Sequence, residues 1–164
     1  MYASKRMSTS STSKSALEVG TKVQPFQATL QDGSEINSTT LLRENPYLLL
    51  IFYPGDDTPG CTKQLCGVRD VYAEYRELGV RVLGVNNGGE ESHKKFIEKY
   101  EYPFDIIVDH DRALAEEFGA IGSFFGNAVT KRGVFLLNNQ HEIVFQKWGQ
   151  QDNQKIIDML KQRD

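Results

Sequence analysis

Cysteine is scarce in this chain of 164 residues, which contains two, Cys61 and Cys66. Small secreted domains that rely on disulfides carry several pairs of cysteines, so a stabilising disulfide framework is excluded. Long apolar runs are lacking too. The most hydrophobic stretch, residues 47–53, has the length of a strand and falls far short of the roughly 20 residues that a membrane span needs. We therefore expect no membrane partner.

An excess of positive charge is also missing, because 19 Lys and Arg stand against 22 Asp and Glu, for a net charge of −3. Such a balance gives no field that would attract nucleic acid or anionic lipid, so we expect neither as a partner. The three histidines have no ligand-like spacing with one another or with the cysteines. Asp105, Asp109 and Asp111 lack the glycine and glutamate of a calcium-binding EF-hand. The sequence therefore predicts no metal and no cofactor.

The start of the chain has its own composition. Residues 1–15 are rich in Ser and Thr and poor in apolar side chains, which predicts a disordered tail, with one folded domain over residues 16–164. The tail carries Lys5, Arg6 and Lys14 but lacks the apolar core of a secretory signal peptide, so a cytoplasmic location is our first expectation. Because the segment is basic, hydroxyl-rich and acid-poor, a transit segment to an organelle is the alternative.

Strand and helix patterns alternate along the rest of the chain. Apolar periodicity and turn residues predict strands at 26–30, 34–36, 47–53, 80–85, 106–108, 133–137 and 142–147, and helices at 59–78, 91–100, 112–118 and 153–162. The first two strands form a peripheral hairpin, and a βαβ half is followed by an antiparallel hairpin and a covering helix. We therefore predict an α/β, thioredoxin-like fold, with a central mixed β-sheet flanked by helices and an N-terminal β-hairpin extension.

A loop is expected over residues 119–130, between the third predicted helix and the last pair of strands. It contains an apolar pair, Phe124 and Phe125, beside two glycines. The pair could anchor the loop in the core or form an exposed patch for a partner, and the sequence leaves both interpretations open.

The segment before the longest predicted helix carries the candidate chemistry. Thr58 is a good N-cap and Pro59 suits the first helical position, so Cys61 falls in the first turn. Unpaired amides and the helix dipole would favour its thiolate, the nucleophilic form of cysteine. A small buried cysteine without chemistry is the alternative. Asp56 and Asp57 are expected to face solvent, since carboxylates pointing inward would oppose ionisation of the thiol.

Three short motifs of this region resemble the peroxiredoxins, and within them the bacterioferritin-comigratory-protein or PrxQ group. They are Phe52-Tyr53-Pro54, Thr58-Pro59-Gly60-Cys61-Thr62 and Cys66-Gly67-Val68-Arg69-Asp70. The resemblance extends over about residues 17–160 in the order of elements. It implies that Cys61 is the peroxidatic cysteine and Cys66 the resolving one, joined in an intramolecular disulfide. It also implies that Thr58 holds the peroxide and that Pro54 shields the site.

An arginine from a distant strand is also part of the resemblance. Arg132 stands three residues before Phe135, where the pattern expects it, and its fixed charge would stabilise both the thiolate and the peroxide oxygens. The alternative is a solvated charge at the end of a strand, which is how we interpret Lys131. The chain departs from the family in two places. Asn86-Asn87-Gly88-Gly89 replaces a Ser-x-Asp-like sequence, and residues 119–130 are shorter and less basic than usual.

The function implied by the resemblance is a thiol-dependent peroxidase. It would reduce hydrogen peroxide and small organic hydroperoxides, work as a monomer in antioxidant defence, and regain its thiols from a thioredoxin-type reductant. Two alternatives remain open: a thiol–disulfide carrier, which a Cys-x-x-Cys motif would suit better, and a redox-sensing module whose disulfide changes a binding surface. Repeated consumption of peroxide would separate the peroxidase from both.

Overall fold

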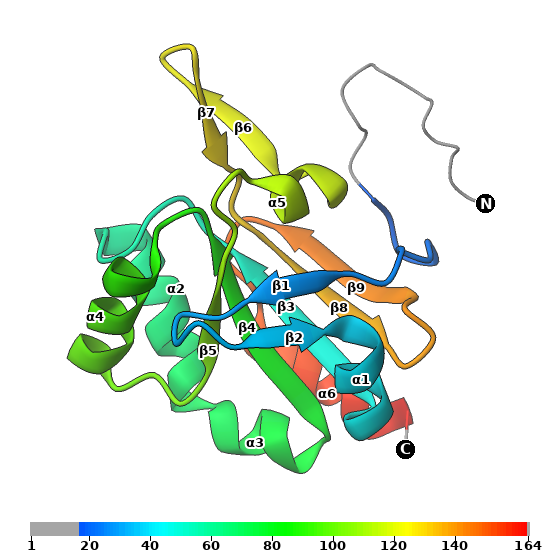
Figure 1. Cartoon of the computed structure of the whole chain (residues 1–164). Helices are drawn as coiled ribbons and strands as arrows, with labels where there is room; N and C mark the ends of the chain where they lie inside the picture. Colours follow the sequence, from blue (N-terminus) through cyan, green and yellow to red (C-terminus); the bar gives the residue numbers. More distant parts are fainter. Residues whose placement is uncertain (1–16, 164) are drawn as a thin grey trace, which may run out of the picture.

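The computed structural model describes residues 17–163, so the predicted tail at residues 1–15 lies outside the described part. A five-stranded mixed sheet forms its centre, with the strands in the order β5-β4-β3-β8-β9 (Figure 1). The central strand β3 pairs in parallel with β4, which pairs in parallel with β5, whereas β8 and β9 add antiparallel on the other side. The strands are β3 (Tyr47–Phe52), β4 (Val80–Asn86), β5 (Asp105–Val108), β8 (Gly133–Asn138) and β9 (Ile143–Trp148). This arrangement agrees with the predicted mixed sheet.

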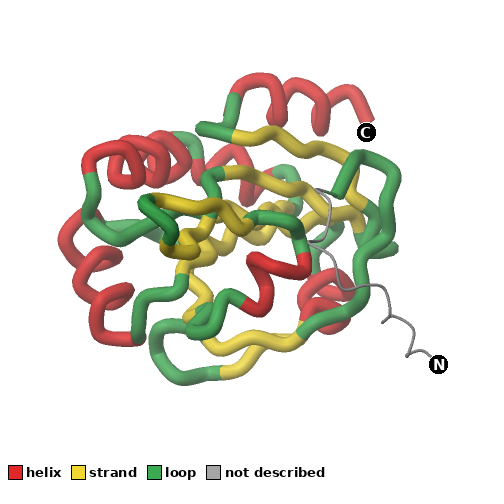
Figure 2. The backbone as a smooth tube through the Cα atoms, turned by 90° about the horizontal axis from the view of Figure 1, so that it is seen from above, coloured by secondary structure: helices red, strands yellow, loops and turns green. Residues whose placement is uncertain are grey.

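Helices cover both faces of the sheet, which explains why β3 is apolar at every position (Figure 2). Its side chains alternate, so that Leu49 and Ile51 enter one core and Leu48, Leu50 and Phe52 the other. The first core is closed by α2 (Pro59–Asp70), α3 (Tyr72–Glu77), α4 (Glu90–Tyr100) and α6 (Asn153–Arg163). The second is closed by α1 (Ser38–Glu44) and α5 (Ala113–Glu117).

The N-terminal hairpin was expected and is present, as β1 (Gln27–Thr29) paired antiparallel with β2 (Glu35–Asn37). A bridge between Leu30 and Ile107 attaches it to the edge strand β5. The helix α1 that follows was not predicted, because its seven residues are too few to show a clear apolar period. Its N-cap does leave a signal: Asn37 Oδ1 accepts hydrogen bonds from the amides of Thr39 and Thr40, at 2.8 and 3.3 Å.

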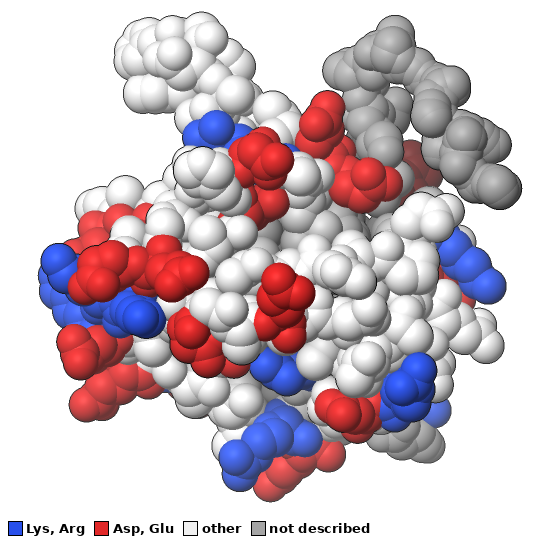
Figure 3. Space-filling model, viewed as in Figure 1, with Lys and Arg blue, Asp and Glu red and all other residues white. Residues whose placement is uncertain are grey.

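Two predicted segments need correction. The single helix expected at 59–78 is two helices, because Val71 adopts φ −118° and ψ 16° and interrupts the hydrogen-bond ladder between α2 and α3. The loop expected at 119–130 contains a hairpin, β6 (Ile121–Phe124) and β7 (Asn127–Thr130). Phe124 and Phe125 are 63% and 88% exposed at its tip, so they do not anchor it in the core. The hairpin projects from the sheet in Figure 1, and Figure 3 shows its tip without charged side chains.

Within residues 17–163, no helix is both long and apolar enough to cross a bilayer.

Candidate active site

The candidate nucleophile, Cys61, lies shortly after the end of the central strand β3. A short loop, residues 53–58, leads from β3 into α2, and Cys61 lies in the first turn of that helix with no exposed surface. Thr58 is the N-cap residue as predicted, and its carbonyl accepts from the Thr62 amide at 2.8 Å. Its hydroxyl, however, donates to the Gly55 carbonyl at 2.9 Å instead of capping the helix. The first-turn amides of α2 therefore have no side-chain cap within the described chain and remain available to an anion.

The sheet brings Arg132 to this turn from 71 residues further along the chain. Arg132 directly precedes β8, whose first residue, Gly133, lies opposite Phe52 at the end of β3. Its Nη1 donates to Gln64 Oε1 at 2.7 Å. Its Nη2 lies 3.0 Å from the position that a Cβ on Gly60 would occupy, so the guanidinium packs against the backbone next to Cys61. The structure therefore unites Arg132 with the Cys61 turn, and it is half-buried, unlike a solvated charge at a strand end.

Lys131 is directed elsewhere, as the sequence suggested. Its Nζ lies 4.1 Å from the centroid of the Trp148 ring, in a cation–π contact, and the side chain is exposed. Neighbouring basic residues thus have separate surroundings, and Lys131 serves as a natural control for Arg132.

Cys66 lies on the same helix as Cys61, and both thiols are free. It is half-buried, and its Sγ lies 3.5 Å from the hydroxyl of Tyr102. Five residues of regular helix separate the two Cα atoms by about 8–9 Å. Because a disulfide rarely joins Cα atoms more than about 7 Å apart, the helix holds the two cysteines near each other but unbonded.

The two aspartates before Thr58 behave differently, and the expectation that both face solvent is wrong for one of them. Asp57 is exposed and contacts Lys99 Nζ at 2.9 Å and the Tyr100 hydroxyl at 2.8 Å. The Asp56 side chain is 8% exposed and faces inward, where it contacts His93 Nδ1 at 2.6 Å. Between the two carboxylates the chain turns sharply, because Asp57 has a left-handed backbone with φ 56°.

Burial and hydrogen bonding compete at Asp56. Burial acts to raise the pKa of this carboxyl, but hydrogen bonds from His93, Ser92 and Tyr53 outweigh it and leave the pKa below its usual value. The pKa of the Tyr53 phenol is raised well above its usual value, by burial first and then by the charge of Asp56. Tyr53 therefore remains a protonated donor toward Asp56. The pairing of Asp56 with His93 was missed from the sequence, because the two are 37 residues apart and no local pattern links them.

The remaining site residues that the sequence proposed lie at the surface. Pro54 and Thr58 are both exposed, in the loop between β3 and α2. The departure at Asn86-Asn87-Gly88-Gly89 has a structural role: the Asn86 amide donates to the Tyr53 carbonyl at 2.7 Å, and its Oδ1 accepts from the Gly88 amide at 2.8 Å. Asn86 thereby ties the end of β4 to the end of β3, just where the loop to α2 begins.

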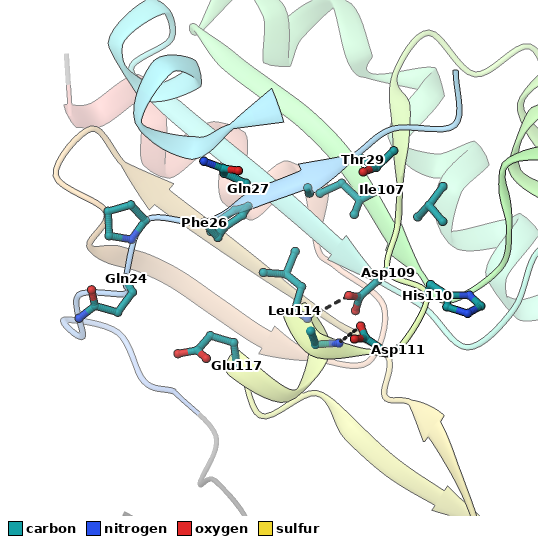
Figure 4. A pocket seen from close by; sticks show the side chains of 14 residues that line it. Gln24, Phe26, Gln27, Thr29, Ile107, Asp109, His110, Asp111, Leu114 and Glu117 are labelled. Carbon is teal, nitrogen blue, oxygen red and sulfur yellow. Dashed lines mark hydrogen bonds between the residues drawn. The ribbon is translucent and has the colours of Figure 1, made fainter. Parts of the chain in front are cut away.

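A cavity of about 780 Å³ lies apart from these residues, between the N-terminal hairpin and α5 (Figure 4). Its buried carboxylate, Asp109, accepts from the amides of Leu114 and Ala115 and so caps α5. Neither cysteine lines the cavity, and Arg132 does not either. Within residues 17–163, no group of three or more His, Cys, Asp or Glu side chains is placed to hold a metal ion.

Comparison with known proteins agrees with this geometry. Residues 19–146 match the model of the AhpC/TSA family. The chain belongs to this family. Its relatives include a peroxiredoxin of the bcp type from Coxiella burnetii, 37% identical over 106 residues that cover 65% of this chain and 69% of the relative. The chloroplastic peroxiredoxin Q of Triticum aestivum is 36% identical over 121 residues, covering 68% of this chain and 55% of the relative.

Solved structures support the same assignment. BcpB from Mycobacterium tuberculosis superposes with a TM-score of 0.83, covering 90% of this chain and 99% of that one at 24% identity, and so supports the fold. The bacterioferritin comigratory protein of Xanthomonas campestris gives a TM-score of 0.74 at 25% identity, over 84% of this chain and 91% of that one. The predicted thioredoxin-like fold and the resemblance to the peroxiredoxin Q and Bcp group are confirmed. The chain is a peroxiredoxin, and thus a thiol-dependent peroxidase.

Proposed function

We propose that Cys61 is the peroxidatic cysteine and Cys66 the resolving cysteine of a peroxidase that completes its cycle within one chain. The Cys61 thiolate attacks one oxygen of the peroxide O–O bond, which breaks. Cys61 becomes a sulfenic acid, and the other oxygen leaves as an alcohol or, from hydrogen peroxide, as water. Cys66 then attacks the sulfenic sulfur, a Cys61–Cys66 disulfide forms and water leaves. A dithiol reductant returns two electrons and restores both thiols.

One observation carries this proposal: Cys61 lies in an uncapped first turn of α2, with the Arg132 guanidinium packed against the adjacent Gly60. Free amides and a fixed cation at one place favour a thiolate over a thiol. The same groups are suited to the negative charge that develops on the peroxide oxygens as the O–O bond breaks. Cys66 lies in the second turn of α2, beyond the first-turn amides.

Thr58 and Pro54 are proposed to act at the mouth of the site. The Thr58 hydroxyl donates to the Gly55 carbonyl, so it is oriented in the loop directly before the Cys61 turn. A hydroxyl at this place can exchange that bond for one to a peroxide oxygen. Pro54 lies exposed at the start of the same loop, where its ring would limit the access of water.

The substrates proposed are hydrogen peroxide and small organic hydroperoxides. The Xanthomonas campestris protein has alkyl peroxide reduction activity, which supports the second class. The full burial of Cys61 argues against direct exchange with bulky protein disulfides and favours a small substrate. A thioredoxin-type protein is proposed as the reductant, acting after Cys66 has become accessible.

We also propose a monomer, with one domain over residues 16–164, a tail at residues 1–15 and a cytoplasmic location. The alternative is an organelle, because several plant relatives are named chloroplastic. The tail can be tested directly by fusing residues 1–15 to a fluorescent protein and observing its location in the cell.

The function is tested by following peroxide loss with a thioredoxin system as electron donor. Wild-type protein is expected to consume many equivalents of hydrogen peroxide or cumene hydroperoxide per chain, and Cys61→Ser to consume none. A disulfide carrier would reduce protein disulfides without this turnover, and a sensor would react once. Full peroxidase activity in Cys61→Ser, with Cys66 as the oxidised residue, would overturn the assignment of roles.

A further inference from the structure

A buried hydrogen-bond network joins the loop before α2 to α4 and to the end of β4. At its centre, His93 of α4 has no exposed side-chain surface and lies 2.6 Å from Asp56 of the loop. Asp56 Oδ1 accepts from the Tyr53 hydroxyl and Oδ2 from the Ser92 hydroxyl, each at 2.6 Å. His93 Nε2 lies 3.2 Å from the Asn86 carbonyl oxygen. The network therefore connects three chain segments: the loop before α2, the first turn of α4 and the end of β4.

The partners of the His93 ring determine where its protons lie. The Asn86 carbonyl can only accept a hydrogen bond, so Nε2 donates. Asp56 accepts from the Tyr53 and Ser92 hydroxyls, which favours its carboxylate form, and a carboxylate requires Nδ1 to donate as well. These contacts fit a pair in which an imidazolium and a carboxylate compensate the buried charge of each other.

The loop after β4 packs closely against the pair of His93 and Asp56. A Cβ placed on Gly88 would lie 3.0 Å from Asn86 Oδ1, 3.1 Å from His93 Cε1 and 3.3 Å from Asp56 Oδ2. Each of these distances is tighter than ordinary van der Waals contact. A side chain at Gly88 would thus press on both members of the pair at once. This close contact explains why a glycine occupies position 88 in the loop after β4.

The loop that Asp56 belongs to is the one that sets the start of α2. Asp56 is two residues before Thr58, the N-cap, and five before Cys61. Apart from Asp57, whose ion pair with Lys99 is exposed, Asp56 is the loop's charged anchor to the rest of the described chain. Movement of Asp56 would therefore displace the first-turn amides and the Thr58 hydroxyl relative to the guanidinium of Arg132.

We propose that His93 is a positioning residue for peroxide attack: as a buried imidazolium paired with Asp56, it fixes the loop that places Thr58 and Cys61. It acts through Asp56 and touches no reacting atom. The inference rests on the proposed function of Cys61. Its effect is confined to the first chemical step, because disulfide closure depends on release of α2 and not on the precision of its first turn.

Two measurements on the intact protein test this. Nitrogen NMR of labelled His93 should show a doubly protonated ring at neutral pH in the wild type. Stopped-flow kinetics should show that His93→Asn and Asp56→Asn slow sulfenic acid formation by at least about tenfold, since small misplacements at a reacting centre have effects of that size. The first-order rate of disulfide closure should not fall. Gly88→Ala, which keeps both charges, should slow the first step as well.

Asp57→Asn is the matched control, because it removes the neighbouring carboxylate and an exposed ion pair from the same loop. Both of its rates should stay within about twofold of wild type. A His93 ring with one unprotonated nitrogen would overturn the charged pair, and equal slowing of both steps, or of neither, would overturn the positioning role. If wild-type Cys61 itself fails to react with peroxide, the proposed function falls, while the NMR result still reports on the pair.

Discussion

Arg132 Nη1 donates a hydrogen bond of 2.7 Å to Oε1 of Gln64, which links the start of β8 to the second turn of α2. Gln64 is fully buried, so this bond is shielded from water and holds the guanidinium in one orientation. The result is a fixed cation beside Gly60 and Cys61. A flexible arginine at the surface would lose this advantage by sampling many rotamers.

Removal of the cation should impair peroxide attack. We expect Arg132→Ala to lower the second-order rate of Cys61 oxidation by about 100-fold, the usual effect of losing one group that stabilises developing charge. Lys131→Ala, which removes the adjacent charge over Trp148, should stay within about twofold. Stopped-flow fluorescence with hydrogen peroxide measures both. Equal small effects in the two variants would remove Arg132 from the site.

The hydrogen bond that Gln64 accepts from Arg132 should affect peroxide attack only through the guanidinium. Gln64→Met keeps the buried volume but removes the acceptor, so we expect a loss of about tenfold in the same rate. In the Arg132→Ala background, Gln64→Met should have little further effect, because the interaction is already gone. A double-mutant cycle on the oxidation rate decides this. Additive losses would mean that Gln64 acts independently of the guanidinium.

The second cysteine should be needed for turnover and not for the first reaction. Cys66→Ser is expected to consume one equivalent of peroxide and then stop, leaving Cys61 as a sulfenic acid open to further oxidation. Intact mass spectrometry with a sulfenic-acid trap identifies the product. Sustained turnover of Cys66→Ser with thioredoxin as the sole reductant would argue that Cys66 does not resolve the intermediate in this chain.

The position of Cys61 could be predicted from the sequence because the signals are local. Thr58 and Pro59 define a helix start, and the apolar run before them defines the central strand. Contacts made across the sheet could not be predicted in the same way. The approach of Arg132 depends on the antiparallel pairing of β3 with β8, and so the sequence supported it only through a family resemblance. Pairing of Asp56 with His93 depends on the tertiary fold entirely.

The two segments that were predicted wrongly from the sequence have causes of the same kind. The break at Val71 was not visible because the apolar spacing continues through it: Val68, Tyr72 and Tyr75 all face the same core. The β6–β7 hairpin was missed because its turn is Phe125-Gly126 with positive φ at both residues, 51° and 80°. Asparagine or aspartate is the usual residue before the glycine of such a turn, and a phenylalanine there gives no turn signal.

Acid should weaken the fold partly through Asp56. The pKa of Asp56 is lowered in the folded state. Its contribution to stability is therefore complete above the pKa of an unfolded aspartate, which is about 4. That contribution is lost as the pH falls through the lower folded value. Asp56→Asn should therefore be less stable than wild type at pH 7, and the difference should shrink below about pH 4.

Urea unfolding at a series of pH values measures this difference. Asp109 acts with the opposite sign, because burial raises its pKa, but it is present in both proteins and cancels from the comparison. Asp57→Asn, whose carboxylate is exposed, serves as the control. A difference between wild type and Asp56→Asn that stays constant from neutral to acid pH would contradict the buried ion pair.

The last prediction concerns motion, because the helix that positions both cysteines cannot hold them bonded. With Cα atoms about 8–9 Å apart in a regular helix, closure of the Cys61–Cys66 disulfide requires the first turns of α2 to unwind. Unwinding must break the hydrogen bond of 3.2 Å from Gln151 to the Gln64 carbonyl. It must also move Gly67 away from Asn153 of α6. The two are close, because a Cβ built on Gly67 would lie 3.6 Å from Asn153 Nδ2.

Opening should stop where the helix is already interrupted. Val71 separates α2 from α3, and Tyr75 of α3 is fully buried and donates to Asn153 Oδ1 at 2.7 Å. On oxidation we therefore expect amide hydrogen exchange to accelerate in residues 60–69 and to remain slow in α3. Cys66→Ser treated with the same peroxide forms no disulfide and should keep its protection. Unchanged exchange in residues 60–69, in a sample whose intact mass proves the disulfide, would mean that the bond forms by a different rearrangement.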